Sequence, residues 1–133
     1  MSVLIDINVA IHLRDLEASV LRRLSDAGEQ LSMSILTVIE LEGGVSQEPG
    51  RAEARRIGLR RLLKAADVIE CDLSVATVYG DIIQRLGFSR SRLIDRLIAA
   101  TSIVHDLTLI TINGPDFRDI PGLALDVWPA PGQ

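Results

Sequence analysis

The chain has 133 residues with a formal net charge of −4, and 47% of them are hydrophobic although only four are aromatic. This length predicts a single domain, residues 1–133. The acidic balance argues against a general polyanion-binding surface, so a nucleic-acid contact would need a local basic patch or a bound metal. One cysteine, Cys71, excludes an internal disulfide and no apolar run reaches the roughly 18 residues of a membrane span, so we expect a cytoplasmic protein with Cys71 as a small buried hydrophobe.

Apolar runs and amphipathic stretches alternate from the N-terminus onward. Residues 1–5 form a short apolar run that ends at Asp6, which predicts a buried first strand followed by a carboxylate. One or two short helices are expected over residues 9–27. A second strand is expected over residues 31–36.

The segment after the second strand has two interpretations. Thr37 is followed three residues later by Glu40, which is the spacing of a capping box and predicts a helix over residues 38–45. Glu40 and Glu42 lie about 200° apart on that helix, so only one of them can face a given site. Glu40 therefore either caps the helix or supplies a carboxylate to a site, and the pattern alone favours neither.

A basic segment, RAEARRIGLRRLLK, follows a turn-rich connector at residues 46–50. Its apolar stripe through Leu59, Leu62 and Leu63 predicts a helix. A solvated helix face is the usual meaning of such a run, but clustering within an acidic protein also makes it the candidate surface for phosphate groups or for a protein partner. The basic residues of this segment are Arg51, Arg55, Arg56, Arg60, Arg61 and Lys64.

The second half of the chain continues the alternation. A third strand is expected over residues 68–71, and Asp72 or Ser74 can cap the next helix, which Gly87 ends. A last strand is expected over residues 123–128. Strands that alternate with helices in this way predict an α/β fold with a five-stranded, mainly parallel sheet and helices on both faces.

Between the helix that Gly87 ends and the last strand, a segment with helical periodicity is followed directly by a short apolar run. Apolar residues recur at i, i+3, i+4 and i+7 in residues 92–104, which predicts a helix, and Asp95 lies beside its buried stripe. The run LTLIT, residues 107–111, predicts a buried strand. The chain then enters a loop that carries Asn113 and Asp116. Ligands bind outside the carboxyl ends of strands in open α/β sheets, so this loop is a candidate site.

Right-handed α/β topology can bring four acids to one end of the sheet. Four carboxylates cannot share a pocket at neutral pH without a cation, and no lysine or histidine lies at a matching position. Hard oxygen ligands favour Mg²⁺ or Mn²⁺, which would polarise a phosphoryl oxygen and activate a water for phosphodiester hydrolysis. The four acids are Asp6, Glu40, Asp95 and Asp116.

Four segments of the chain together resemble a PIN-domain ribonuclease, specifically the VapC-type toxin of bacterial type II toxin–antitoxin pairs. The segments are LIDINVAI, SILTVIELEGGV, IDRLIAATSIVHDLTLITINGPDF and the strand that ends in Trp128. They span nearly the whole chain in the expected order. The resemblance implies a Mg²⁺- or Mn²⁺-dependent endoribonuclease whose metal-binding and catalytic acids are Asp6, Glu40, Asp95 and Asp116.

The resemblance also implies partners, and the sequence departs from the family pattern at one position. It implies a five-stranded parallel sheet, a homodimer, an RNA substrate and a cognate VapB-type antitoxin whose C-terminal segment blocks the active site in a toxin–antitoxin hetero-oligomer. Asn8 matches the polar residue two positions after the first acid. Ile7 departs from the family, which usually has Thr or Ser there, so a hydroxyl is missing from the rim of the site.

Two alternatives compete with this interpretation. A phosphotransferase or phosphatase of haloacid dehalogenase or receiver type also places Asp after its first strand. The dehalogenase type requires a second Asp where this chain has Asn8, both types require a late lysine, and the only lysine is Lys64. A catalytically silent PIN-like module that only binds a partner is favoured by Ile7 and opposed by the presence of all four acids.

Overall fold

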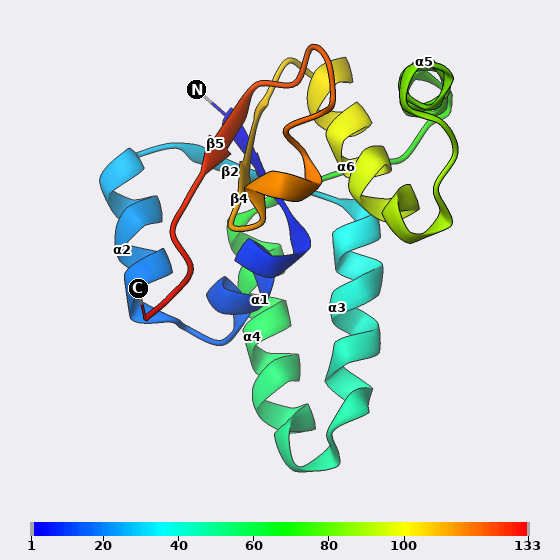
Figure 1. Ribbon diagram of the computed structural model, residues 1–133. Helices are drawn as coiled ribbons and strands as arrows, with labels where there is room; N and C mark the ends of the chain where they lie inside the picture. Colours follow the sequence, from blue (N-terminus) through cyan, green and yellow to red (C-terminus); the bar gives the residue numbers. More distant parts are fainter. Residues whose placement is uncertain (1, 133) are drawn as a thin grey trace.

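Five strands form the centre of the computed structural model, which describes residues 2–132. They are β1 (Ser2–Ile5), β2 (Gln30–Ser34), β3 (Asp67–Ile69), β4 (Thr108–Thr111) and β5 (Leu125–Val127). Their order in the sheet is β3-β2-β1-β4-β5, and every pairing among the described residues is parallel (Figure 1). The predicted sheet is therefore confirmed, with β1 at its centre.

Six helices of the described part cover both faces of this sheet. They are α1 (Ile7–Arg14), α2 (Ala18–Ala27), α3 (Ile35–Gln47), α4 (Ala52–Ala65), α5 (Leu73–Leu86) and α6 (Leu93–Val104). Helices α1 to α4 contribute to one hydrophobic core, and α5 and α6 contribute to the other. Helices α3 and α4 form a hairpin that projects beyond the sheet in Figure 1. None of the helices described is long and apolar enough to cross a membrane.

The central strands are buried on both sides. Val3 and Ile5 of β1 belong to the core beneath α1 to α4, whereas Leu4 belongs to the core beneath α5 and α6. In β4, Ile110 belongs to the core beneath α1 to α4, and Leu109 belongs to the core beneath α5 and α6. Successive side chains of a strand point to opposite faces, so a strand covered on both faces needs a continuous apolar run. This explains why Val3, Leu4 and Ile5 follow one another in β1, and Leu109 and Ile110 in β4, without a polar residue between them.

The predicted boundary between β2 and α3 is wrong. Strand β2 ends at Ser34, and the Ser34 hydroxyl caps α3 by accepting a hydrogen bond from the Leu36 amide at 3.0 Å. Thr37 lies inside the first turn of α3 and is buried, so it caps nothing. The capping-box interpretation of Glu40 is therefore excluded. A serine three residues earlier already supplies the cap that the helix requires.

The remaining differences are local. Leu16, with φ of 59°, separates α1 from α2, so residues 9–27 hold parts of two helices. Asp72 rather than Ser74 caps α5, because its Oδ1 accepts a hydrogen bond from the Val75 amide at 3.2 Å. Cys71 is exposed, and its predicted burial is wrong. The reason is that β3, an edge strand, ends two residues earlier and the chain has already left the sheet.

Helix α4 packs unusually close to α1. A Cβ atom built on Gly58 would lie 2.3 Å from the Arg14 carbonyl oxygen, so only glycine permits this separation. Arg14 is itself buried, with its Nε donating to Asp15 Oδ1 at 2.9 Å. The contact matters for the acidic site, because α1 begins directly after the first acid of that site.

Candidate active site

The first predicted acid lies at the junction of β1 and α1. Asp6 is 3% exposed and caps α1, its Oδ1 accepting a hydrogen bond from the Val9 amide at 3.0 Å. Its Oδ2 accepts a hydrogen bond from the Thr111 hydroxyl at the end of β4. The carboxylate is thus held by its own helix and by the neighbouring strand, which leaves it little freedom.

Burial dominates the electrostatics of this carboxylate. Burial raises the pKa of Asp6 above its ordinary value, and the hydrogen bonds from Thr111, Val9 and Asn8 oppose that rise without cancelling it. The negative charge of Asp116 raises the pKa further. An ionised Asp6 therefore costs the folded protein free energy unless a cation lies beside it.

Two further acids share this environment. Asp95 lies in the first turn of α6 and is half-buried. Burial raises the pKa of Asp95, the charges of Asp116 and Asp6 raise it further, and Arg92 lowers it. Asp116 ends a 3₁₀ turn (Gly114–Asp116) that follows β4. The structure therefore brings Asp6, Asp95 and Asp116 together at the carboxyl ends of the two central strands, as the topology predicted.

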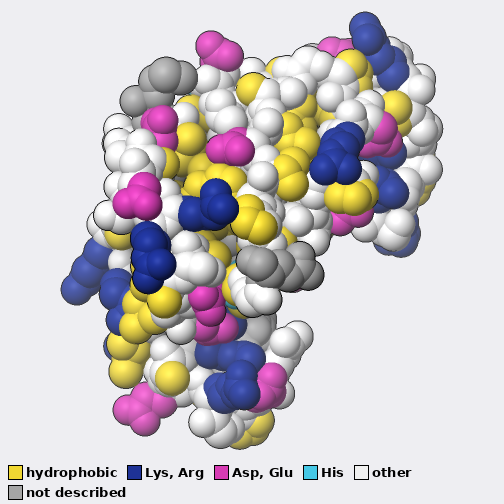
Figure 2. Space-filling view, turned by 60° about the vertical axis from the view of Figure 1, so that its left-hand side comes forward, with side chains coloured by type: hydrophobic (Ala, Val, Ile, Leu, Met, Phe, Trp, Pro, Cys, Tyr) yellow, Lys and Arg dark blue, Asp and Glu magenta, His cyan; other side chains and the backbone are white. Residues whose placement is uncertain are grey.

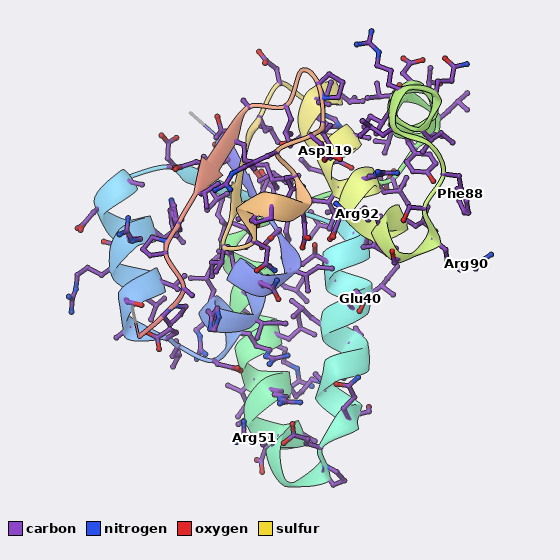
Figure 3. The ribbon with its side chains drawn as sticks, viewed as in Figure 1. Glu40, Arg51, Phe88, Arg90, Arg92 and Asp119 are labelled. Carbon is purple, nitrogen blue, oxygen red and sulfur yellow. The ribbon has the colours of Figure 1, made fainter. Side chains whose placement is uncertain are left out.

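The fourth predicted acid is placed differently. Glu40 is exposed on α3 and is not among the charges that shift the pKa of Asp6 or Asp95. It lines a cavity of about 250 Å³ between α1, α3 and α4, together with Ile7, the residue after Asp6. Figure 3 shows Glu40 partway along α3, whereas the other three acids belong to other elements of the fold. Glu40 therefore stands at the rim of the acidic cluster rather than within it.

The donor set fits a hard divalent cation. All four side chains offer only carboxylate oxygens, and burial together with repulsion from neighbouring acids raises the pKa of Asp6 and of Asp95. Across residues 2–132, no three His, Cys, Asp or Glu side chains form a ready-made cage. Mg²⁺ keeps several of its waters and usually takes one or two carboxylates plus substrate phosphate, so it does not require a cage of three protein ligands.

Two residues of this site were not predicted from the sequence. The first is Thr111, which was expected only as the end of a strand, yet its hydroxyl donates to Asp6 and accepts a hydrogen bond from the Asn113 amide at 2.9 Å. No signal in the sequence could have found it, because the contact depends on the register of β4 against β1, in which Ile5 faces Ile110. Thr111 therefore supplies the cluster with a hydroxyl despite the apolar residue at position 7.

The second unpredicted residue is Arg92. It is half-buried before α6, and its Nη1 donates to the Asp116 carbonyl oxygen at 3.5 Å. Its charge also acts on Asp95. The available signal was its position three residues before Asp95, which is one helical turn on the same face. Arginine, and not only lysine or histidine, therefore provides a cation beside the acids.

The structure divides the basic residues of α4. Arg55 Nη1 donates to the Gly44 carbonyl oxygen at 2.7 Å and Nη2 pairs with Glu48 at 3.1 Å, which ties α4 to α3. Arg56 pairs with Glu42 at 2.9 Å. These contacts are within the helical hairpin, so both arginines have a structural role there.

The other members of the set lie closer to solvent. Arg51 pairs with Glu48 at 3.4 Å, and Arg61 Nη2 donates to the Arg14 carbonyl oxygen at 3.4 Å. Arg60 and Lys64 are exposed on α4. Figure 2 shows basic and acidic side chains interspersed on the face it displays, not one continuous basic surface. A local contact with a partner is therefore more consistent with this surface than general polyanion binding.

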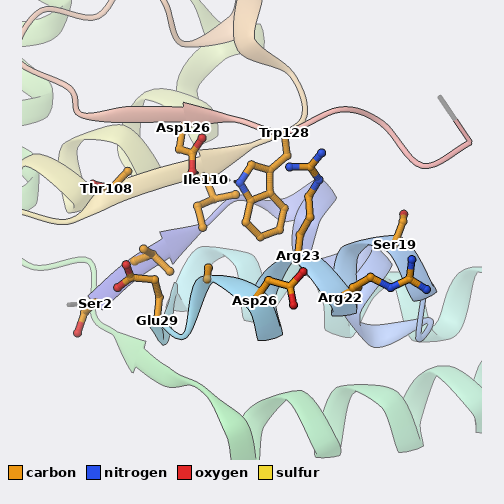
Figure 4. Close-up of a pocket in the computed structure, with 12 residues that line it drawn as sticks. Ser2, Ser19, Arg22, Arg23, Asp26, Glu29, Thr108, Ile110, Asp126 and Trp128 are labelled. Carbon is orange, nitrogen blue, oxygen red and sulfur yellow. Dashed lines mark hydrogen bonds between the residues drawn. The ribbon is translucent and has the colours of Figure 1, made fainter.

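A larger cavity, of about 810 Å³, lies away from the acids (Figure 4). It separates α2 from the face of the central strands, and its lining includes Arg22, Arg23 and Trp128. The indole Nε1 of Trp128 donates to Asp126 Oδ2 at 3.1 Å, so the ring is fixed by a contact within the chain. None of the four predicted acids lines this cavity, so its volume does not identify the reactive site.

Comparison with known proteins identifies this architecture. Residues 3–123 match the PIN domain family model, and the chain belongs to the PIN domain family. It is 29% identical over 102 residues, 74% of each chain, to "Ribonuclease VapC2" of Rickettsia felis (strain ATCC VR-1525 / URRWXCal2). The expected PIN domain of VapC type is confirmed, and the haloacid dehalogenase and receiver alternatives are set aside.

Solved structures support the same fold. The structure of VapBC2 from Rickettsia felis bound to a DNA fragment from its promoter aligns with 96% of this chain and 99% of the other, at a TM-score of 0.83 and 24% identity. A toxin–antitoxin complex from Klebsiella pneumoniae covers 97% of this chain and 100% of the other, at a TM-score of 0.76 and 27% identity. The α/β PIN fold therefore extends over almost the whole chain.

Proposed function

We propose that this chain, a VapC-type ribonuclease toxin of a type II toxin–antitoxin system, hydrolyses RNA phosphodiester bonds with the help of bound Mg²⁺ or Mn²⁺. The observation that carries the metal requirement is the convergence of Asp6, Asp95 and Asp116, two of which have a raised pKa. Buried carboxylates that repel one another destabilise a fold, and a divalent cation would relieve that cost.

The residues have distinct roles in this proposal. Asp6, fixed by Val9 and Thr111, and Asp95, fixed on a packed helix, would hold the ion directly. Asp116, in a short turn, would act through water, and Glu40 would complete the acidic rim from α3. When bound, such an ion polarises a phosphoryl oxygen and lowers the pKa of a coordinated water.

We expect RNA cleavage to require Mg²⁺ or Mn²⁺, to stop in EDTA, and to leave a 5′-phosphate and a 3′-hydroxyl. These ends follow if water, rather than the ribose 2′-hydroxyl, attacks the phosphorus. The measurement is end analysis of single-stranded RNA fragments produced with and without chelator. Restoring the ion in excess over EDTA should restore cleavage, which is the control. Products with cyclic 2′,3′-phosphates that persist in EDTA would contradict this mechanism.

We further propose a VapB-type antitoxin as the partner of this chain, with a homodimer as the unit that binds it. The structures named above contain toxin–antitoxin complexes of relatives. On this chain, half-exposed Ile57 lies beside Arg60 and Lys64 in a shallow cavity of about 500 Å³ on α4. An antitoxin segment with apolar and acidic side chains would complement that surface.

Neutralising this surface tests the proposal. The double variant Arg60→Gln and Lys64→Gln is expected to weaken antitoxin binding about 2- to 30-fold, because each of two exposed ion pairs contributes about 0.2 to 1 kcal/mol. RNA cleavage and metal affinity should be unchanged. Isothermal titration calorimetry with the cognate antitoxin measures the effect, and Arg22→Gln with Arg23→Gln on α2 is the matched control. Unchanged affinity for the antitoxin would contradict the proposal and would mean that this face of α4 is merely solvated.

A further inference from the structure

One aromatic side chain stands out by its exposure. Phe88, in the segment between α5 and α6, is 65% exposed, whereas Phe117 and Trp128 are 2% and 6% exposed. An isolated surface hydrophobe is common and needs no explanation. Phe88 differs because the segment that carries it is held in place and is flanked by cations.

The backbone around Phe88 is anchored from within the fold. Gly87 ends α5 with φ of 82°, and its carbonyl oxygen accepts a hydrogen bond from Arg96 Nη1 at 2.7 Å. Arg96 is 4% exposed, so a buried cation of α6 is committed to this carbonyl. The hydroxyls of Ser89 and Ser91 lie 3.2 Å apart and hydrogen bond to each other. The segment therefore presents Phe88 in a preorganised position.

The same segment connects Phe88 to the acidic cluster. The 3₁₀ turn Arg90–Arg92 follows at once, and Arg92 reaches Asp116 and acts on Asp95. Four residues of chain separate the Cα atoms of Phe88 and Arg92 by at most about 14 Å. Figure 3 shows Phe88 and Arg90 pointing outward from this segment, with Arg92 on its inner side. This segment therefore leads from an exposed aromatic ring, past two guanidinium groups, to the acids.

We propose that Phe88 stacks on a base of single-stranded RNA, while Arg90 and Arg92 contact backbone phosphates and lead the strand to the acids. The inference rests on the proposed ribonuclease function. Sites for single-stranded nucleic acid combine aromatic stacking platforms with cations that follow the backbone. Stacking accepts every base, so this subsite positions the strand without reading its sequence.

Binding of a fluorescent single-stranded RNA 20-mer of random sequence tests the proposal, with Ca²⁺ in place of Mg²⁺ to prevent cleavage. Phe88→Ala should raise the Kd about 5- to 100-fold, and Phe88→Trp should restore it. Leu73→Ala is the matched control, because Leu73 is 82% exposed at the opposite end of α5. Arg90→Gln should lower the slope of log Kd against log salt by about 0.7, the value for one phosphate on a single strand.

The outcomes separate this inference from the proposed function. If the parent protein cleaves RNA with Mg²⁺ but Phe88→Ala binds RNA as the parent does, the stacking site is wrong and the ribonuclease assignment stands. If Phe88→Ala changes the molar mass in light scattering without changing RNA affinity, Phe88 belongs to a contact between copies of the chain, which also overturns the inference. If the parent neither binds nor cleaves RNA, the proposed function fails and the inference fails with it.

Discussion

Asp6→Asn is expected to reduce RNA cleavage by more than about 100-fold and to abolish the rise in melting temperature that Mn²⁺ produces in the parent. The same variant should melt higher than the parent when both are free of metal. The amide keeps the shape of the carboxylate and can still accept the helix-capping hydrogen bond from Val9. It also removes a buried negative charge, which is unfavourable in the folded protein, as the raised pKa of the Asp6 carboxyl group indicates. Cleavage assays and thermal melts with and without Mn²⁺ measure both effects.

The higher stability expected for metal-free Asp6→Asn, relative to the metal-free parent, should depend on pH in a defined direction. Burial raises the pKa of Asp6 and Asp95 in the folded protein above the ordinary value of 3.8. The folded state therefore binds these protons more tightly than the unfolded state does, and the parent loses stability as pH rises from about that value through the folded pKa. The advantage of Asp6→Asn should consequently be largest at neutral pH and should disappear in acid.

The effects of replacing the other acids should depend on how rigidly the fold holds each carboxylate. Asp95→Asn, on a packed helix, should behave as Asp6→Asn does. Asp116→Asn should also lose activity but should retain more metal affinity in calorimetric titration, because its short turn leaves it freer to act through water. Asp119→Asn, an exposed acid three residues further on, is the control and should resemble the parent. If Asp116→Asn binds Mn²⁺ no better than Asp6→Asn, the order is wrong, and Asn113 becomes the next residue to test.

Gly58→Ala is expected to lower the free energy of unfolding by about 2 to 3 kcal/mol. The new methyl group would lie 2.3 Å from the Arg14 carbonyl oxygen, and two helix backbones, not a flexible side chain, would have to move apart. Because α1 begins directly after Asp6, the shift should also reduce activity. Chemical denaturation measures the stability change.

Gly43→Ala provides the matched control for this change. Gly43 lies inside α3, and a Cβ atom added there would have no atom within 4 Å, so alanine should stabilise the protein by about 0.5 to 1 kcal/mol through its better helix propensity. Opposite signs for the two substitutions are the expected result. Equal effects would mean that α4 can move away from α1 without cost and that the close approach is not required.

The sequence alone determined the order of elements and the positions of three acids. The 3.6-residue repeat of α6 and the apolar run of β4 are visible in the sequence because both elements are largely buried. Burial requires apolar side chains at fixed intervals along a helix or a strand. The acids follow directly. Asp6 comes one residue after a strand, Asp95 beside a helical stripe, and Asp116 shortly after a strand, so parallel topology was sufficient to gather them.

Only the tertiary structure decided which side chains complete that cluster. Thr111 and Asp6 are 105 positions apart in the chain, and their hydrogen bond exists because β4 pairs with β1 in one register. Likewise, the structure assigned Arg55 and Arg56 to contacts with α3 and left Arg60 and Lys64 exposed, a distinction that the run of basic residues did not contain. Periodicity reports whether a position is buried, whereas the partner of a polar side chain is set by how separate elements dock, and that information is not local in the sequence.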